Sequence, residues 1–184
     1  MTKTFKKIFL TFLLIILSIS IFSISFAASR WYTLCVLSVW SVDSGKHLDW
    51  SGSTQYSSNW NTGVNTWNNY ISGVIRQDTI STINDVTISD VPQLTGDVIA
   101  TTTQYGTGHS SNSTIQFSVP RMNTLSNLQR TIVCSHEIGH ALGLDENQTS
   151  YSHIMFDDIT FNSSNNVLSS EDKSNYTYMY NNKY

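Results

Sequence analysis

The sequence predicts an α+β domain in which a β-sheet packs on two helices and a third helix follows near the C-terminus. Two amphipathic helical patterns stand out, one at residues 57–71 and one at residues 123–142. Short runs of β-branched and aromatic residues, separated by turn residues, occupy much of the chain before and between them. The sequence contains no internal repeat, so we expect a single domain after the N-terminal leader.

Residues 1–27 form a predicted signal peptide. Lys3, Lys6 and Lys7 precede an apolar run from Ile8 to Phe26, and Ser25-Phe26-Ala27 has the form of a cleavage site. The apolar run is longer than the usual core of roughly 7–15 residues, so an uncleaved membrane anchor is the alternative. In the first case we expect a secreted, extracellular protein, and in the second a membrane-anchored domain that faces outward.

The first elements are expected between residues 28 and 73. Residues 28–46 form a lead-in segment, whose β-branched stretch at residues 31–42 alternates poorly. The domain itself spans residues 47–184 and begins with a strand at His47–Trp50, where polar and apolar residues alternate. A helix capped by Ser57 or Ser58 follows and ends at Ser72-Gly73. Its apolar stripe consists of Trp60, Val64, Trp67 and Ile71.

Four further strands are expected at residues 74–76, 85–89, 97–104 and 114–119. Pro120 ends the last of them, because proline cannot donate a ladder hydrogen bond. Asn123 or Thr124 then begins the central helix, and Gly143 suits the sharp turn at its end. The sequence Ser169-Ser170-Glu171-Asp172 places a cap and two acids at the start of the last helix.

The central helix carries two of the five histidines, His136 and His140, and Glu137 directly follows the first. Positions i and i+4 share one face of a helix, so both imidazoles can bind one metal ion. Zn²⁺ binds imidazole nitrogen, and a catalytic zinc site keeps one position open for water. Glu137 lies beside the face that carries the two histidines, where it can accept a proton from the water and later pass it to a leaving amine. The pattern therefore predicts a zinc-dependent hydrolase.

The longer pattern HExxHxxGxxE at residues 136–146, followed by Ser152-His153-Ile154-Met155-Phe156, resembles the metzincin metallopeptidases, most of all their matrixin branch. The resemblance implies a zincin-like fold, with a twisted, mostly parallel sheet that has an antiparallel edge strand. It also implies that the helix breaks at Gly143 and that Met155 forms a tight turn, the Met-turn, beneath the metal. The strand at residues 97–104 would then form the upper rim of a cleft for an extended peptide. The implied function is a zinc endopeptidase that acts on extracellular proteins.

The third zinc ligand is where the sequence departs from the family it resembles. That position usually holds histidine, less often aspartate, and here it is Glu146. Because a carboxylate oxygen binds Zn²⁺ well, we predict Glu146 as the third ligand, with Asp145 and His153 as alternatives. The departure leaves open a catalytically silent metzincin-like domain that binds protein or wall material. The intact Glu137 favours the enzyme.

We expect one catalytic zinc ion, a protein or peptide substrate and a monomeric protein. Nucleic acid is excluded as a partner, because 10 Lys and Arg face 13 Asp and Glu and no basic stripe is present outside the leader. His47 and His109 are expected at the surface or in loops. A structural calcium ion at the polar loops is left open, although no acidic loop signature supports it. Cys35 and Cys134 either form one disulfide or remain thiols, because a single pair has no diagnostic spacing.

Overall fold

The computed structural model describes residues 34–106, 112–148, 152–158 and 165–184, so the predicted signal peptide and His109 lie outside the described residues. Within this part of the chain, no helix is both long enough and apolar enough to cross a membrane. Cys35 and Cys134 are not joined by a disulfide. The elements run in the order β1 (Leu48–Gly52), α2 (Ser57–Asn68), β2 (Ile75–Gln77), β3 (Val86–Val91), β4 (Ala100–Tyr105), β5 (Asn112–Ser118), α3 (Val119–Thr124), α4 (Asn127–Ala141) and α5 (Ser170–Asn182).

The five strands form one sheet with the order β2-β1-β3-β5-β4. β1 runs parallel to β2 and to β3, and β3 runs parallel to β5. β4 lies at the edge of the sheet. It is antiparallel to β5, because the connection between these two strands is too short for a parallel crossover. The predicted α+β fold with a mostly parallel sheet and an antiparallel edge strand is confirmed.

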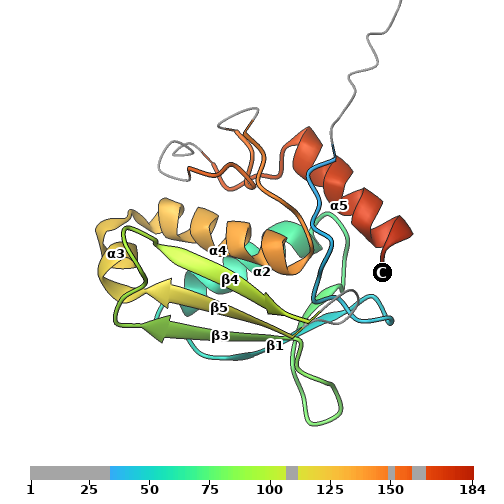
Figure 1. The fold of residues 1–184 in the computed structure, drawn as a ribbon, viewed down its shortest axis with the longest axis horizontal. Helices are drawn as coiled ribbons and strands as arrows, with labels where there is room; N and C mark the ends of the chain where they lie inside the picture. The colour runs from blue at the N-terminus through green and yellow to red at the C-terminus, as the bar shows by residue number, and fades with distance from the viewer. Residues whose placement is uncertain (1–33, 107–111, 149–151, 159–164) are drawn as a thin grey trace, which may run out of the picture. The chain divides into compact units, whose positions relative to one another are not determined.

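One face of the sheet is apolar, and helices cover it. Val86 and Ile88 of β3 are buried while Thr87 between them is exposed. β5 repeats this alternation with Ile115 and Phe117. Trp60 of α2 packs edge-on against Phe117, with ring centroids 6.3 Å apart, and α4 lies beside α2 (Figure 1). The alternation in the strands therefore places α2 and α4 against the sheet.

Close contacts between α2 and α4 hold the central helix in place. The indole N–H of Trp67 donates to the carbonyl oxygen of Ser135 at 2.8 Å. The side-chain amide of Asn59 donates to Thr131 Oγ1 at 2.8 Å. A Cβ atom on Gly63 would lie only 3.1 Å from the backbone nitrogen of Ser135, so glycine permits the helices to approach closely. These contacts hold α4 against α2 from Thr131 to Ser135.

The predicted cap of the first helix is wrong. Neither Ser57 nor Ser58 takes the N-cap position, which Tyr56 occupies without a side-chain cap hydrogen bond. Asp90 at the end of β3 accepts instead from the backbone N–H of Gln55 at 2.8 Å. Thr54 accepts from the N–H of Tyr56 at 3.1 Å, so both bonds hold the turn before the helix and neither caps its first N–H groups. The helix also ends earlier than predicted, at Asn68.

The predicted start of the central helix, at Asn123 or Thr124, is also wrong. The residues after β5 form the short helix α3, with Pro120 in its first turn. Proline is tolerated there because an N–H group in the first turn would have no acceptor within the helix. α4 begins only at Asn127. Its N-cap is Ser126, which forms a reciprocal capping box with Gln129.

The described part of the lead-in segment, residues 34–46, does not join the sheet. It runs beside the chain that leaves α4, and Val36 forms an isolated antiparallel bridge with Leu144. Leu37 N–H donates to Gly143 O at 2.8 Å, and Asp145 N–H donates to Cys35 O at 3.0 Å. The segment thus braces the turn that follows the central helix.

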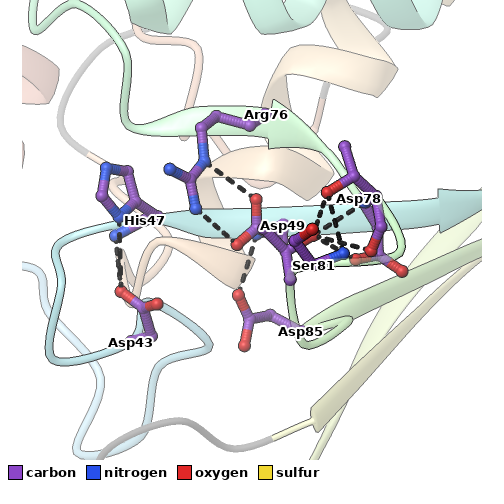
Figure 2. A network of polar contacts seen from close by, with 9 residues as sticks. Asp43, His47, Asp49, Arg76, Asp78, Ser81 and Asp85 are labelled. Atoms are coloured by element: carbon purple, nitrogen blue, oxygen red, sulfur yellow. Dashed lines mark hydrogen bonds and ion pairs between the residues drawn. The ribbon is translucent and has the colours of Figure 1, made fainter.

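A buried polar network ties β1 to β2 and to the loop before β3 (Figure 2). Arg76 donates to both carboxylate oxygens of Asp49, at 2.9 and 2.7 Å. Asp85, only 4% exposed, accepts the backbone N–H of Asp49 at 2.8 Å. Carboxylate oxygens of Asp43, Asp49 and Asp85 lie within 4.8 Å of one another. The cluster is not visible in the sequence, because Asp85 lies far along the chain from Asp43 and Asp49.

Burial raises the pKa of Asp85 from its ordinary value of 3.8 to about 6. The hydrogen bond from Asp49 N–H and the charge of Arg76 oppose this shift, and the carboxylates of Asp43 and Asp49 add to it. Between these two pH values the folded protein binds more protons than the unfolded chain. The contribution of Asp85 to stability therefore falls as the pH rises from about 4 to about 6.

Replacing Asp85 by asparagine should remove this loss of stability with rising pH, because the amide side chain stays neutral. Its oxygen can still accept the hydrogen bond from the backbone N–H of Asp49. The free energy of unfolding of D85N relative to the wild type should rise by up to about 2–3 kcal/mol between pH 4 and pH 6 and then level off. Urea unfolding at a series of pH values measures this difference. D97N, which removes a carboxylate with 89% side-chain exposure, controls for net charge. A difference for D85N that does not vary with pH would contradict the assignment.

Candidate metal centre

The residues of the central motif lie on the buried second half of α4. His136 and Glu137 are buried and His140 is half-buried. The capping box at Ser126 starts the helix, and contacts with α2 fix its middle. The two imidazoles therefore project from a rigid part of the structure, with ring centroids 4.6 Å apart.

Hydrogen bonds determine which nitrogen of each imidazole carries the proton. His136 Nδ1 lies 2.8 Å from the carbonyl oxygen of Ile154, and His140 Nδ1 lies 2.9 Å from that of Leu144. A carbonyl oxygen only accepts, so each Nδ1 must donate a proton. In the neutral ring this leaves a lone pair on each Nε2, and the two Nε2 atoms lie 3.0 Å apart. Two lone pairs directed at the same point fit a shared metal ion.

Burial keeps His136 neutral. It lowers the pKa of His136 from 6.5 to about 3, and the neighbouring His140 lowers it further, while the hydrogen bond to Ile154 opposes the shift. Because only a neutral imidazole binds a metal, His136 is ready to act as a ligand at physiological pH without first losing a proton.

The structure brings Glu146 to the two histidines. One ligand atom from each of His136, His140 and Glu146 lies within 4.8 Å of the others. The alternatives lie elsewhere: Asp145 accepts the N–H of Glu146 at 2.9 Å, and His153 Nε2 lies 2.6 Å from Glu171. Two imidazole nitrogens and one carboxylate oxygen are a donor set that suits catalytic Zn²⁺. The geometry thus favours Glu146, and its role as a ligand stays a prediction.

The chain reaches Glu146 through a sharp turn at Gly143. This residue has φ 82°, a left-handed conformation that glycine adopts without strain. Gly143 N–H donates to His140 O at 2.8 Å, and Leu144 N–H donates to Gly139 O at 2.9 Å. This pair of bonds is the Schellman motif. It ends the helix at Ala141, one residue after His140, and turns the chain back toward the histidines.

Met155 packs against α4 at Gly139, the residue directly before His140. It is 1% exposed, and a Cβ atom on Gly139 would collide with its sulfur, so glycine at 139 makes room for it. Asp172 accepts the backbone N–H of Ile154 at 2.9 Å and that of Met155 at 3.4 Å. Asp172 also closes the capping box of α5 with Ser169, as predicted. The last helix therefore holds the backbone whose carbonyl orients His136.

Glu137 faces a cleft of about 540 Å³ that is also lined by His136, His140 and Glu146. Burial raises the pKa of its carboxyl group. The nearby Glu146 adds to the shift, whereas His140 and the hydrogen bond from Thr102 oppose it. A carboxylate with a raised pKa holds a transferred proton more readily, as a general base requires.

Two residues of β4 that contact α4 were not predicted from the sequence, and one of them, Thr102, also lines the cleft. Thr102 Oγ1 lies 2.7 Å from Glu137 Oε2, and Gln104 Nε2 donates to His140 O at 2.8 Å. The predicted rim strand contains both, and their two-residue spacing places them on one face. That this face points toward α4 depends on tertiary packing. His47 was expected at the surface or in a loop. It lies half-buried in the loop before β1, with its Nδ1 3.9 Å from Asp43 Oδ1.

Comparison with known protein families gives a match to the matrixin family over residues 46–181. The matched range contains all of the strands and helices described above except the last residue of α5, Asn182. A search of curated proteins gives no match. The match confirms the resemblance inferred from the motif and the Met-turn.

Replacing Glu146 by glutamine should lower the affinity for zinc by at least about tenfold, because an amide oxygen is a weaker ligand than a carboxylate. Competition with a fluorescent chelator measures the affinity. D145N, one position earlier, should leave it unchanged and serves as the matched control. H153Q tests the remaining alternative and should affect stability rather than zinc. Unchanged zinc affinity in E146Q would remove Glu146 as a ligand.

Proposed function

The chain belongs to the matrixin family, and we propose that it is a secreted, zinc-dependent endopeptidase that hydrolyses extracellular proteins. The observation that carries the proposal is the pair of Nε2 lone pairs on His136 and His140, directed at one point beside a buried carboxylate. A domain that only bound protein would not need Glu137 at that place. The family itself implies zinc metallopeptidase activity in general terms.

His136, His140 and Glu146 would hold the zinc ion. When bound, the ion would supply Lewis-acid polarisation of the scissile carbonyl and of the attacking water. Glu137 accepts one proton from the water as the water oxygen bonds to the carbonyl carbon. It then delivers that proton to the amide nitrogen as the carbon–nitrogen bond breaks. The products are a carboxylic acid and an amine, and Glu137 returns to its ionised form.

A substrate peptide would bind in extended form along β4. This strand is at the edge of the sheet, and only β5 pairs with it among the described strands. Its residues 100–102 line the same cleft as the histidines. An edge strand offers backbone N–H and C=O groups to an added strand, so affinity would come mainly from main-chain hydrogen bonds. Side chains of the substrate then need only fit around the cleft.

Mutation of Glu137 to glutamine should lower kcat for casein or a peptide substrate by about 10²–10⁴-fold, because an amide cannot take up the proton. Bound zinc, measured by atomic absorption, should be unchanged. A chelator should abolish hydrolysis by the wild type, and added zinc should restore it. If the zinc-loaded wild type hydrolysed no member of a broad peptide library, the catalytically silent binding domain would become the better explanation.

The proposed secretion rests on the leader at residues 1–27. Expression of the full chain in a bacterium with a working export pathway should release a product that begins at Ala28, because cleavage is expected after Ala27. Mass spectrometry of the medium and of the membrane fraction measures this. Full-length protein found only in the membrane fraction would support the anchored alternative instead.

A further inference from the structure

We propose that Thr102 is a positioning residue for the proton acceptor Glu137, an inference that rests on the proposed function. Thr102 lies in the middle of the edge strand β4. Its hydroxyl Oγ1 is 2.7 Å from Glu137 Oε2 and 3.0 Å from the backbone carbonyl oxygen of Glu137. One side chain of the substrate-binding strand thus contacts both the backbone and the carboxylate of the residue that moves the proton.

The hydroxyl can restrict the orientation of the carboxylate. Both neighbouring oxygens accept hydrogen bonds, so the single hydroxyl proton lies between them. Threonine is branched at Cβ, and its χ1 angle has few accessible values, so the hydroxyl is itself held in place. The contact occupies one carboxylate oxygen of Glu137. The other oxygen is left to accept the proton from water.

Glu137 needs such a contact because its side chain has three rotatable bonds and ends in a cleft. A general base must lie within hydrogen-bond distance of the proton that it removes. Loss of the hydroxyl would let the carboxylate adopt other orientations in the 540 Å³ cleft. Partners that orient functional groups in this way typically contribute about 10–100-fold to activity.

Thr102 also helps to attach β4 to α4, and this purely structural role must be separated from the proposed one. Gln104 provides the comparison. It lies two residues along the same strand and donates to His140 O at 2.8 Å, without a contact to the Glu137 carboxylate. Loss of Gln104 should therefore weaken the attachment of the strand while leaving the orientation of Glu137 unchanged.

The test compares three variants with the wild type on one peptide substrate. T102V removes the hydroxyl and keeps the shape of the side chain, and it should lower kcat by about 10–100-fold with little change in KM. T102S keeps the hydroxyl and should retain most of the activity. Q104L should change KM or the midpoint of thermal unfolding more than kcat. Zinc content should be the same in all four proteins.

Two kinetic results would overturn the proposal. The first is a T102V enzyme with the kcat of the wild type. The second is a Q104L enzyme that loses as much kcat as T102V at equal thermal stability, which would reduce Thr102 to an attachment between strand and helix.

A structural measurement separates this proposal from the proposed function. Crystal structures of the wild type and T102V should show the Glu137 carboxylate hydrogen-bonded to Thr102 in the first and displaced in the second. If the zinc-loaded wild type hydrolyses no peptide, the proposed function fails, while these structures still report on the contact. A wild-type crystal structure without the hydrogen bond from Thr102 to Glu137 would overturn the positioning role even in an active enzyme.

Discussion

The geometry of the candidate site depends on two hydrogen bonds, from His136 Nδ1 to Ile154 O and from His140 Nδ1 to Leu144 O. They fix the proton on Nδ1 of each ring and turn the two Nε2 lone pairs toward one point. Both acceptors lie after the helix in the chain. The site therefore exists only if the chain turns back sharply and is held beneath the helix.

Several separate segments meet this requirement. The Schellman motif at Gly143 turns the chain, and the lead-in segment braces the turn through its bonds to Gly143 and Asp145. Asp172 at the start of α5 holds the backbone at Ile154 and Met155. α2 fixes the helix from the other direction through Trp67. Much of the fold thus serves to hold two backbone carbonyls within hydrogen-bond distance of two imidazoles.

Local patterns predicted the fold well where a single segment carries its own signal. Alternation located β3 and β5, and the Ser169–Asp172 capping box located α5, because each pattern lies within one element. The predicted cap of α2 was wrong, because the helix starts without a side-chain cap and Asp90 of β3 instead holds the turn before it through Gln55. The predicted start of α4 was wrong because Asn123 and Thr124, which had been assigned to α4, belong to the short helix α3.

The sequence by itself determined the spacing of His136, Glu137 and His140, the turn at Gly143 and the family to which they point, because helical periodicity and a left-handed glycine are local properties. Only the tertiary structure placed Glu146 rather than Asp145 or His153 beside the histidines. The contact from Thr102 to Glu137 likewise became visible only in the folded chain. These contacts join segments that are far apart in the sequence, so their distances follow from the packing of the sheet, the helices and the returning loop.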